Sequence, residues 1–129
     1  MIALPVVPVA KPRMTRQDKW KQRKCVMKYR AYKDELRLRL KPYGDIDLNF
    51  SGVRFVIPMP PSWSMKKRAE MIGQPHTQKP DVDNLLKGLM DALLEDDSGV
   101  HTISVQKVWG EEGGITIRLE NAANEMIAI

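Results

Sequence analysis

The stretch from residue 79 to residue 100 constrains the fold of this chain most, because it combines a strongly amphipathic segment with two acidic pairs. Asp81 and Asp83 precede the amphipathic segment, and Asp96 and Asp97 follow it. At 100° per residue, the apolar side chains between the two pairs fall on one side of a helix. These side chains are Leu85, Leu86, Leu89, Met90 and Leu93. The stretch therefore predicts a helix that buries one face in a core.

The other side of this helix is polar. Asp83 is a good N-cap residue for a helix over residues 84–94. Lys87 and Asp91 lie four residues apart, which makes them neighbours on the polar face. The predicted helix thus has one side for packing and one side that is available for chemistry.

The carboxylates of Asp81 and Asp83 suit a divalent cation. Pro80 favours an extended backbone at Lys79, and alternate residues of an extended segment point the same way. Magnesium prefers a few carboxylates together with water and substrate oxygens, and a bound metal can lower the pKa of a water that attacks phosphorus. Lys87, one turn along, could stabilise the developing charge or protonate the leaving group. The alternative is that these acids only cap a helix and form turns.

The distribution of charge points to a polyanionic partner. The chain has a net charge of +5, but residues 11–41 alone hold thirteen Lys or Arg against three acids. A basic surface beside an acidic site fits a phosphate backbone that lies over metal-binding carboxylates, although a solvated basic helix has the same composition. The candidate contacts to the DNA backbone are Lys11, Arg13, Arg16 and Lys66.

Cysteine content and hydropathy favour a cytoplasmic location without membrane association. Cys25 is the single cysteine, so an intrachain disulfide is excluded and a reducing compartment is expected. No apolar run reaches the length of a transmembrane helix. The apolar start of the chain is short, is broken by Pro5 and Pro8, and has no basic residue before it, which argues against a signal peptide.

The remaining elements follow from alternation and helical spacing. In chain order, the sequence predicts a strand at 2–9, a helix from near Thr15 to about Leu40, a strand at 48–57, a short helix at 62–71 capped by Ser62, the helix at 84–94, and strands at 103–109 and 115–119. Pro5 and Pro8 limit the first strand to an edge or a bulge. This order predicts a single domain over residues 1–129, an α+β fold with a mixed four-stranded sheet covered by helices.

The acidic stretch also resembles a known family. Residues 76–87 read HTQKPDVDNLLK, and they are continued by DAL at 91–93 and DDSGV at 96–100. This pattern is similar to the signature of RusA-type Holliday-junction resolvases, which runs D-x-D-N-L-x-K, then D-A-L, then D-D-x-Q-V. Those proteins are small, dimeric, magnesium-dependent endonucleases often found in phages and prophages. The resemblance is strong over residues 76–100 and elsewhere rests on length and element order.

The resemblance implies roles for individual residues. Asp81, Asp83 and Asp97 match the metal-binding aspartates, and Lys87 matches the catalytic lysine. Gly99 departs from the pattern, because the family usually has glutamine there, so any contact made by that side chain is missing from this chain.

Three further residues are candidate supporting groups: Asp91, Asp96 and His76. The resemblance assigns Asp91 no firm role. For His76 three interpretations remain open: a metal ligand, a phosphate contact, or a loop histidine with neither role. A geometric constraint applies to Asp97, because an eleven-residue helix is about 16 Å long. Either the chain folds back sharply after Leu94, or Asp97 serves a site on the partner subunit of a symmetric dimer.

The function that the resemblance implies is a magnesium-dependent, structure-selective endodeoxyribonuclease that resolves four-way DNA junctions in recombination and repair. Such a homodimer makes paired nicks and leaves 5′-phosphate and 3′-hydroxyl ends, with Mn²⁺ as an expected substitute for Mg²⁺. Two alternatives remain at this level: a non-catalytic basic DNA-binding protein, and a structural partner in a phage recombination complex.

Overall fold

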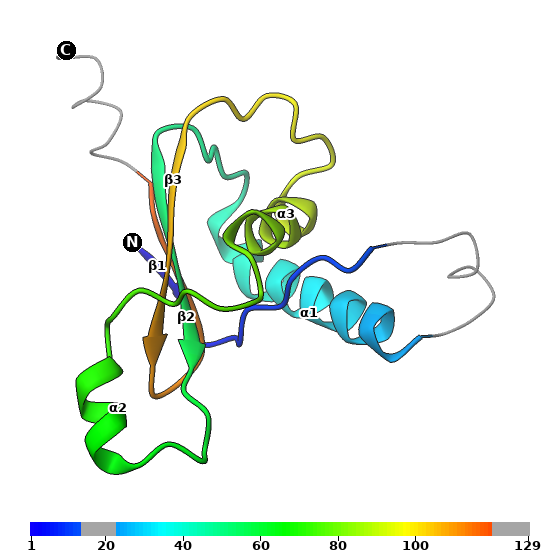
Figure 1. Ribbon diagram of the computed structural model, residues 1–129. Helices are drawn as coiled ribbons and strands as arrows, with labels where there is room; N and C mark the ends of the chain where they lie inside the picture. The colour runs from blue at the N-terminus through cyan, green and yellow to red at the C-terminus, as the bar shows by residue number, and fades with distance from the viewer. Residues whose placement is uncertain (14–22, 120–129) are drawn as a thin grey trace, which may run out of the picture.

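The computed structural model describes residues 1–13 and 23–119, and the structural statements below concern those residues. Three helices, one 3-10 turn and four strands make up this part of the chain (Figure 1). In order they are β1 (Ile2–Leu4), α1 (Lys24–Leu40), η2 (Lys41–Tyr43), β2 (Ser51–Pro58), α2 (Met65–Met71), α3 (Val82–Leu93), β3 (Ile103–Gly110) and β4 (Gly114–Arg118). The predicted α+β fold with a mixed four-stranded sheet is confirmed.

The sheet has the strand order β1-β4-β2-β3. β4 runs antiparallel to both β1 and β2, whereas β2 and β3 are parallel and pair along eight residues each, from Ser51 opposite Ile103 to Pro58 opposite Gly110. Parallel neighbours need a long crossover connection. In this chain the crossover from β2 to β3 contains α2, α3 and both acidic pairs, so the acidic stretch is tied to the sheet at both ends.

Helices α1 and α3 cover one face of the sheet, and the core lies between these two layers (Figure 1). The alternation of β2 and β4 places every second side chain in this core. Its buried members include Val53, Phe55, Ile115 and Ile117 from the sheet, Tyr29 and Leu36 from α1, and Leu85 and Leu89 from α3. Burying one such leucine stabilises the fold by about 1.5–3 kcal/mol, and this sets the rotation of α3 about its axis.

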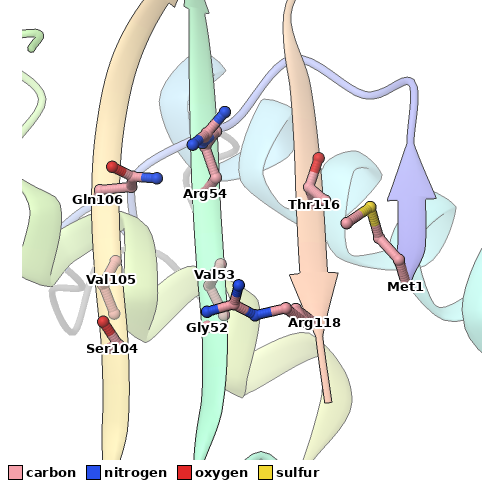
Figure 2. A pocket seen from close by; sticks show the side chains of 9 residues that line it. All are labelled: Met1, Gly52, Val53, Arg54, Ser104, Val105, Gln106, Thr116 and Arg118. Carbon is pink, nitrogen blue, oxygen red and sulfur yellow. The ribbon is translucent and has the colours of Figure 1, made fainter. Parts of the chain in front are cut away.

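Within residues 1–13 and 23–119, no helix covers the opposite face of the sheet (Figure 1). Side chains from all four strands or their ends line a hollow of about 580 Å³ on this face, and Figure 2 shows these side chains. Arg54, Gln106 and Arg118 supply its larger polar groups, together with the smaller side chains of Ser104 and Thr116. The sheet therefore has an apolar face toward the helices and a mixed, basic face toward solvent.

Several predicted boundaries were wrong. The first strand ends at Leu4, because Pro5 cannot donate a ladder hydrogen bond, but its predicted edge position is confirmed. The described part of helix α1 begins at Lys24, because Arg23 has an extended backbone with φ −61° and ψ 140°, and the predicted start near Thr15 lies outside the described residues. Ser64, and not Ser62, caps α2 by accepting a hydrogen bond from the backbone N–H of Lys67 at 3.1 Å. In residues 1–13 and 23–119, no helix is long and apolar enough to cross a membrane.

Gly88 allows the N-terminal segment to cross α3 at close range. A Cβ added at Gly88 would lie 2.9 Å from the backbone oxygen of Val9 and 3.3 Å from Cε1 of Tyr29. The backbone N–H of Lys11 also donates to the carbonyl oxygen of Asn84 in α3 at 3.2 Å. The segment that carries Lys11 is thus packed directly onto the helix between the acidic pairs.

We expect Gly88→Ala to lower the free energy of unfolding by about 1–2 kcal/mol. Overpacking costs about 1–3 kcal/mol, and alanine's higher helix propensity recovers up to about 1 kcal/mol. Urea denaturation followed by circular dichroism measures the change. Gly99→Ala is the control, because an added Cβ there meets nothing within 4 Å. A Gly88→Ala protein more stable than wild type would contradict the close crossing.

Candidate active site

The segment that leads into α3 is fixed to the free edge of β3. The backbone N–H groups of Gly73 and His76 donate to the carbonyl oxygens of Trp109 and Lys107, at 2.8 and 3.0 Å. In return, the N–H of Trp109 donates to the carbonyl oxygen of Gln74 at 3.0 Å. These bonds hold the approach to the acidic stretch in a short antiparallel pairing with the sheet.

The side chain of Lys107 holds the last part of this approach. Its Nζ donates to the carbonyl oxygen of Gln78 at 2.5 Å and to that of Pro80 at 2.8 Å. The Lys79–Pro80 peptide bond between them is cis. The residue immediately before Asp81 is therefore bound by a lysine that projects from the sheet.

Asp81 is the N-cap residue of α3, so the prediction that Asp83 caps the helix was wrong. Asp81 has an extended backbone (φ −72°, ψ 146°), and its carbonyl oxygen accepts from the N–H of Leu85 at 3.1 Å. Its side chain makes no cap hydrogen bond. Asp83 lies in the first helical turn, which also overturns the expectation that both aspartates are extended. The two carboxylates nevertheless share one end of the helix, where the macrodipole favours negative charge.

Asp83 and Lys87 lie one turn apart on the exposed side of α3. Lys87 Nζ is 3.9 Å from Oδ2 of Asp83, and the two side chains are 58% and 67% exposed. A solvent-exposed pair at this spacing is worth only about 0.3–0.5 kcal/mol. Breaking this ion pair therefore costs little free energy, so Lys87 can pair with a phosphate instead of Asp83.

Asp91 lies on α3 but is directed toward α1 and the N-terminal segment. Its Oδ2 accepts a hydrogen bond from the hydroxyl of Tyr29 at 2.6 Å and lies 3.2 Å from Nζ of Lys33. Nζ of Lys11 approaches the same oxygen at 3.9 Å. These contacts make Asp91 an anchor between three segments, and its role as a candidate supporting group stays a prediction.

These contacts also shift two pKa values. Burial acts to raise the pKa of Asp91, but the hydrogen bonds and charges of its partners outweigh burial, and its pKa is lowered. Burial and the hydrogen bond to Asp91 raise the pKa of Tyr29. The phenol therefore stays protonated and the carboxylate stays ionised at neutral pH, which is the combination that the short hydrogen bond requires.

The second acidic pair lies in a turn beyond the other end of α3. Oδ1 of Asp96 accepts from the backbone N–H of Ser98 at 2.9 Å, and this hydrogen bond lowers the pKa of Asp96. The carbonyl oxygen of Asp97 accepts from the N–H of Val100 at 3.0 Å, while the Asp97 side chain is exposed. Asp96 thus shapes the turn, and Asp97 presents its carboxylate to solvent.

Asn49 holds this turn from the side of β2. Its Nδ2 donates to the carbonyl oxygen of Gly99 at 3.0 Å, and its Oδ1 accepts from the N–H of His101 at 2.8 Å. The adjacent Phe50, at a positive φ of 62°, donates its N–H to the carbonyl oxygen of Thr102 at 2.7 Å. Gly99 therefore contributes through its backbone carbonyl. A side chain at this position, such as the glutamine of the family pattern, would start in open space.

His76 is a packing residue in this structure. Its side chain is 3% exposed, and its ring lies 4.3 Å from the ring of Trp109, centroid to centroid. Burial and the nearby charge of Lys107 lower the pKa of His76. A neutral, buried imidazole packed at a tilt of 58° against a tryptophan is poorly placed to reach a phosphate in solvent.

The predicted DNA contacts lie in different parts of the molecule. Lys11 lies beside α3, next to Asp91, as described above. Arg13 is exposed at the end of the first described segment, and Arg16 lies outside the described residues. Lys66 is exposed on α2, at the far end of the sheet from α1 (Figure 1). Of these four, Lys11 is the one that the structure places against the helix of the acidic pairs.

The structure places three of the four predicted catalytic residues at or near the start of α3. Asp81, Asp83 and Lys87 share the start of α3, and Asp97 lies past its end. Within the two described ranges, no three Asp, Glu, His or Cys side chains are grouped so that they could hold one metal ion. Two exposed carboxylates still fit Mg²⁺, which is commonly held by one or two carboxylates, waters and substrate phosphates.

Comparison with known proteins identifies the family. A family model described as "Endodeoxyribonuclease RusA" matches residues 4–120. The chain belongs to the RusA endodeoxyribonuclease family. The family is thus one of enzymes that cut DNA internally, and the resemblance seen in residues 76–100 extends over nearly the whole chain.

One curated relative of this RusA-family chain is the uncharacterized protein YqaN of Bacillus subtilis (strain 168). The two are 37% identical over 79 residues, which cover 55% of this chain and 56% of the relative. The match therefore spans little more than half the length of that relative. No solved structure matched the chain.

Sequence reasoning missed the residues that hold the acidic segments in place. Lys107 had a signal, because it stands on the inward-facing side of β3 with Val105 and Trp109, where a lysine needs polar partners. The sequence carried no signal that pointed to Asn49 or Arg37. Arg37 donates to the carbonyl oxygens of Ala92 and Asp91 at 3.1 and 3.2 Å, so it caps the C-terminal end of α3 from α1.

The Asp91 anchor predicts a specific dependence of stability on pH. Because its pKa is lower in the folded state, Asp91 stabilises the fold above its unfolded pKa near 4, and this contribution is lost as pH falls through the folded value. Asp91→Asn should therefore lower the free energy of unfolding by about 1 kcal/mol or less at pH 7, since the 35%-exposed carboxylate is partly screened by solvent. The difference should shrink below about pH 4.

Urea denaturation of both proteins at pH 7, 5 and 3.5 measures this difference. Asp34→Asn is the matched control, because Asp34 is an exposed aspartate on α1, and we expect its substitution to change stability little at any of these pH values. A deficit of Asp91→Asn that grew on acidification would contradict the anchor.

Proposed function

We propose that this protein is a magnesium-dependent, structure-selective endodeoxyribonuclease that resolves four-way DNA junctions. One observation carries the proposal: a chain of the RusA family presents two exposed carboxylates at the start of α3, with an exposed lysine one turn away. Carboxylates that hold a metal ion and a lysine that stabilises charge on the phosphate are groups that suit metal-assisted cleavage of a phosphodiester.

Asp81 and Asp83 would hold the cation, which is Mg²⁺ with Mn²⁺ as a substitute. When bound, such a cation supplies an activated water and neutralises charge on the phosphate. Asp81 would supply its carboxylate from the N-cap position and Asp83 from the first turn of α3. Lys87 would leave its weak pair with Asp83 and contact the phosphate, where it stabilises the charge that develops in the transition state.

Asp97 would complete the site from the partner subunit of a homodimer. A twelve-residue helix is about 18 Å long, and α3 separates the two acidic pairs along its axis. The absence of a three-carboxylate group within the described part of one chain supports this division. A symmetric dimer has two such composite sites, which suits a substrate that is resolved by paired nicks on opposed strands.

Basic side chains would grip the DNA backbone without reading its sequence. Lys11 would contact the backbone from beside α3, next to Asp91, and Arg13 and Lys66 would add contacts from the N-terminal segment and from α2. Arg16 belongs to the same proposal by its position in the basic segment. Contacts of this kind set affinity and its dependence on salt, so they act on junction binding and not on the cleavage step.

The proposal predicts that the two aspartates are needed for cutting and dispensable for binding. Asp81→Asn and Asp83→Asn should each reduce cleavage of a fixed four-way junction in Mg²⁺ by at least about 100-fold, because a missing ligand weakens both metal binding and water activation. Junction affinity, measured in Ca²⁺ by gel shift, should stay within about twofold, since backbone contacts dominate it. Wild-type products should carry 5′-phosphate and 3′-hydroxyl ends.

Asp45→Asn is the control, because Asp45 is an exposed aspartate outside both acidic pairs; it should cut like wild type. Full activity of Asp81→Asn or Asp83→Asn in Mg²⁺ would remove the metal-site proposal. Wild-type protein that binds four-way, flap and linear DNA but nicks none of them would favour a non-catalytic DNA-binding protein.

A further inference from the structure

Lys107 is unusual among the basic residues of this chain because it points toward the core side of the sheet. On β3 it alternates with Gln106 and Val108 and shares the inward face with Val105 and Trp109. An ammonium group on that face requires oxygen partners. It finds them in the carbonyl oxygens of Gln78 and Pro80, at 2.5 and 2.8 Å.

Both of these carbonyls belong to the segment that delivers the chain to the acidic site. The carbonyl of Pro80 is part of the peptide unit that joins Pro80 to Asp81. The Lys107 contact therefore restricts the orientation of this peptide plane and of the backbone at Asp81. The main-chain oxygen of Lys107 also accepts from the N–H of His76 at 3.0 Å. One residue of β3 thus holds three points of the approach, which Figure 1 shows passing from α2 beside the sheet to α3.

We propose that Lys107 is a positioning residue for the metal site, and that it holds Asp81 at the geometry that binds the cation. This inference rests on the proposed function of Asp81 and Asp83. Lys107 does not contact substrate in this proposal. Its effect passes through the carbonyls of Gln78 and Pro80 to the start of α3.

Positioning and simple electrostatics make opposite predictions for the loss of this lysine. The ammonium group of Lys107, which binds the carbonyl just before Asp81, repels a divalent cation held by Asp81. Removing this charge alone should therefore tighten metal binding. Removing the two hydrogen bonds should loosen Asp81 and weaken metal binding, as loss of outer-shell partners does in metal sites. The sign of the change therefore separates the two explanations.

The experiment compares Lys107→Met, Lys107→Arg and Arg118→Met. Methionine keeps the apolar stem of Lys107 without its donors, and arginine keeps charge and donors. Arg118 lies on the open face of the sheet, so Arg118→Met removes one positive charge away from the approach segment. The dissociation constant of Mn²⁺ is measured without DNA by electron paramagnetic resonance, and kcat and KM for a four-way junction are measured over a range of Mg²⁺ concentrations.

We expect Lys107→Met to weaken Mn²⁺ binding by about 10-fold or more and to lower kcat at limiting Mg²⁺, with KM for the junction unchanged. Lys107→Arg should recover most of the affinity, and Arg118→Met should bind Mn²⁺ like wild type. If Lys107→Met does not fold, as judged by circular dichroism, Lys107→Gln keeps one donor and should weaken Mn²⁺ binding in the same direction.

Unchanged or tighter Mn²⁺ binding by Lys107→Met, in a wild-type background that binds Mn²⁺ and cuts junctions, would overturn the positioning role alone. Failure of Lys107→Arg to recover affinity would also overturn it. A wild-type protein that neither binds Mn²⁺ nor cuts any junction would overturn the proposed function, and the role of Lys107 with it.

Discussion

The burial of one face of α3 is the constraint on which the rest of this structure depends. Leu85 and Leu89 are completely buried between α1 and the sheet, and this fixes which way the helix faces. Asp83 and Lys87 are thereby turned to solvent, and Asp91 is turned to Tyr29 on α1. A helix with a less one-sided apolar pattern could rotate, and Asp83 and Lys87 would then no longer face solvent together.

Polar contacts from other elements then set where the helix begins and ends. Lys107 of β3 holds the residue before Asp81, Arg37 of α1 binds the last carbonyls of α3, and Asn49 holds the turn after Asp97. Each is a side chain that satisfies backbone groups, and a buried backbone group without a partner is costly. The fold therefore uses its obligatory hydrogen bonds to place the acidic pairs at opposite ends of one rigid element.

The sequence was sufficient for the type and order of the elements but not for their ends. Periodicity located α3 and the inward faces of β2 and β4, because both depend on local spacing. The start of α3 at Val82 was missed, and the lysine that binds the carbonyl just before it, Lys107, lies 27 residues further along the sequence. The anchoring of Asp91 depends on a tyrosine 62 residues away. Local sequence patterns do not predict contacts between residues so far apart in the chain. The two acidic pairs, in contrast, were visible in the sequence as a motif.

The central claim is that the two acidic pairs of one protomer serve different composite sites of a dimer. Cleavage by a mixture of Asp81→Asn and Asp97→Asn proteins tests it most directly. Each mutant alone should be inactive, but a heterodimer would contain one intact site, so nicking should return without paired resolution. A mixture of Asp81→Asn and Asp83→Asn should stay inactive and serves as the control. If the Asp81→Asn and Asp97→Asn mixture stays equally inactive under conditions that exchange subunits, Asp97 does not act across the dimer and the account is contradicted.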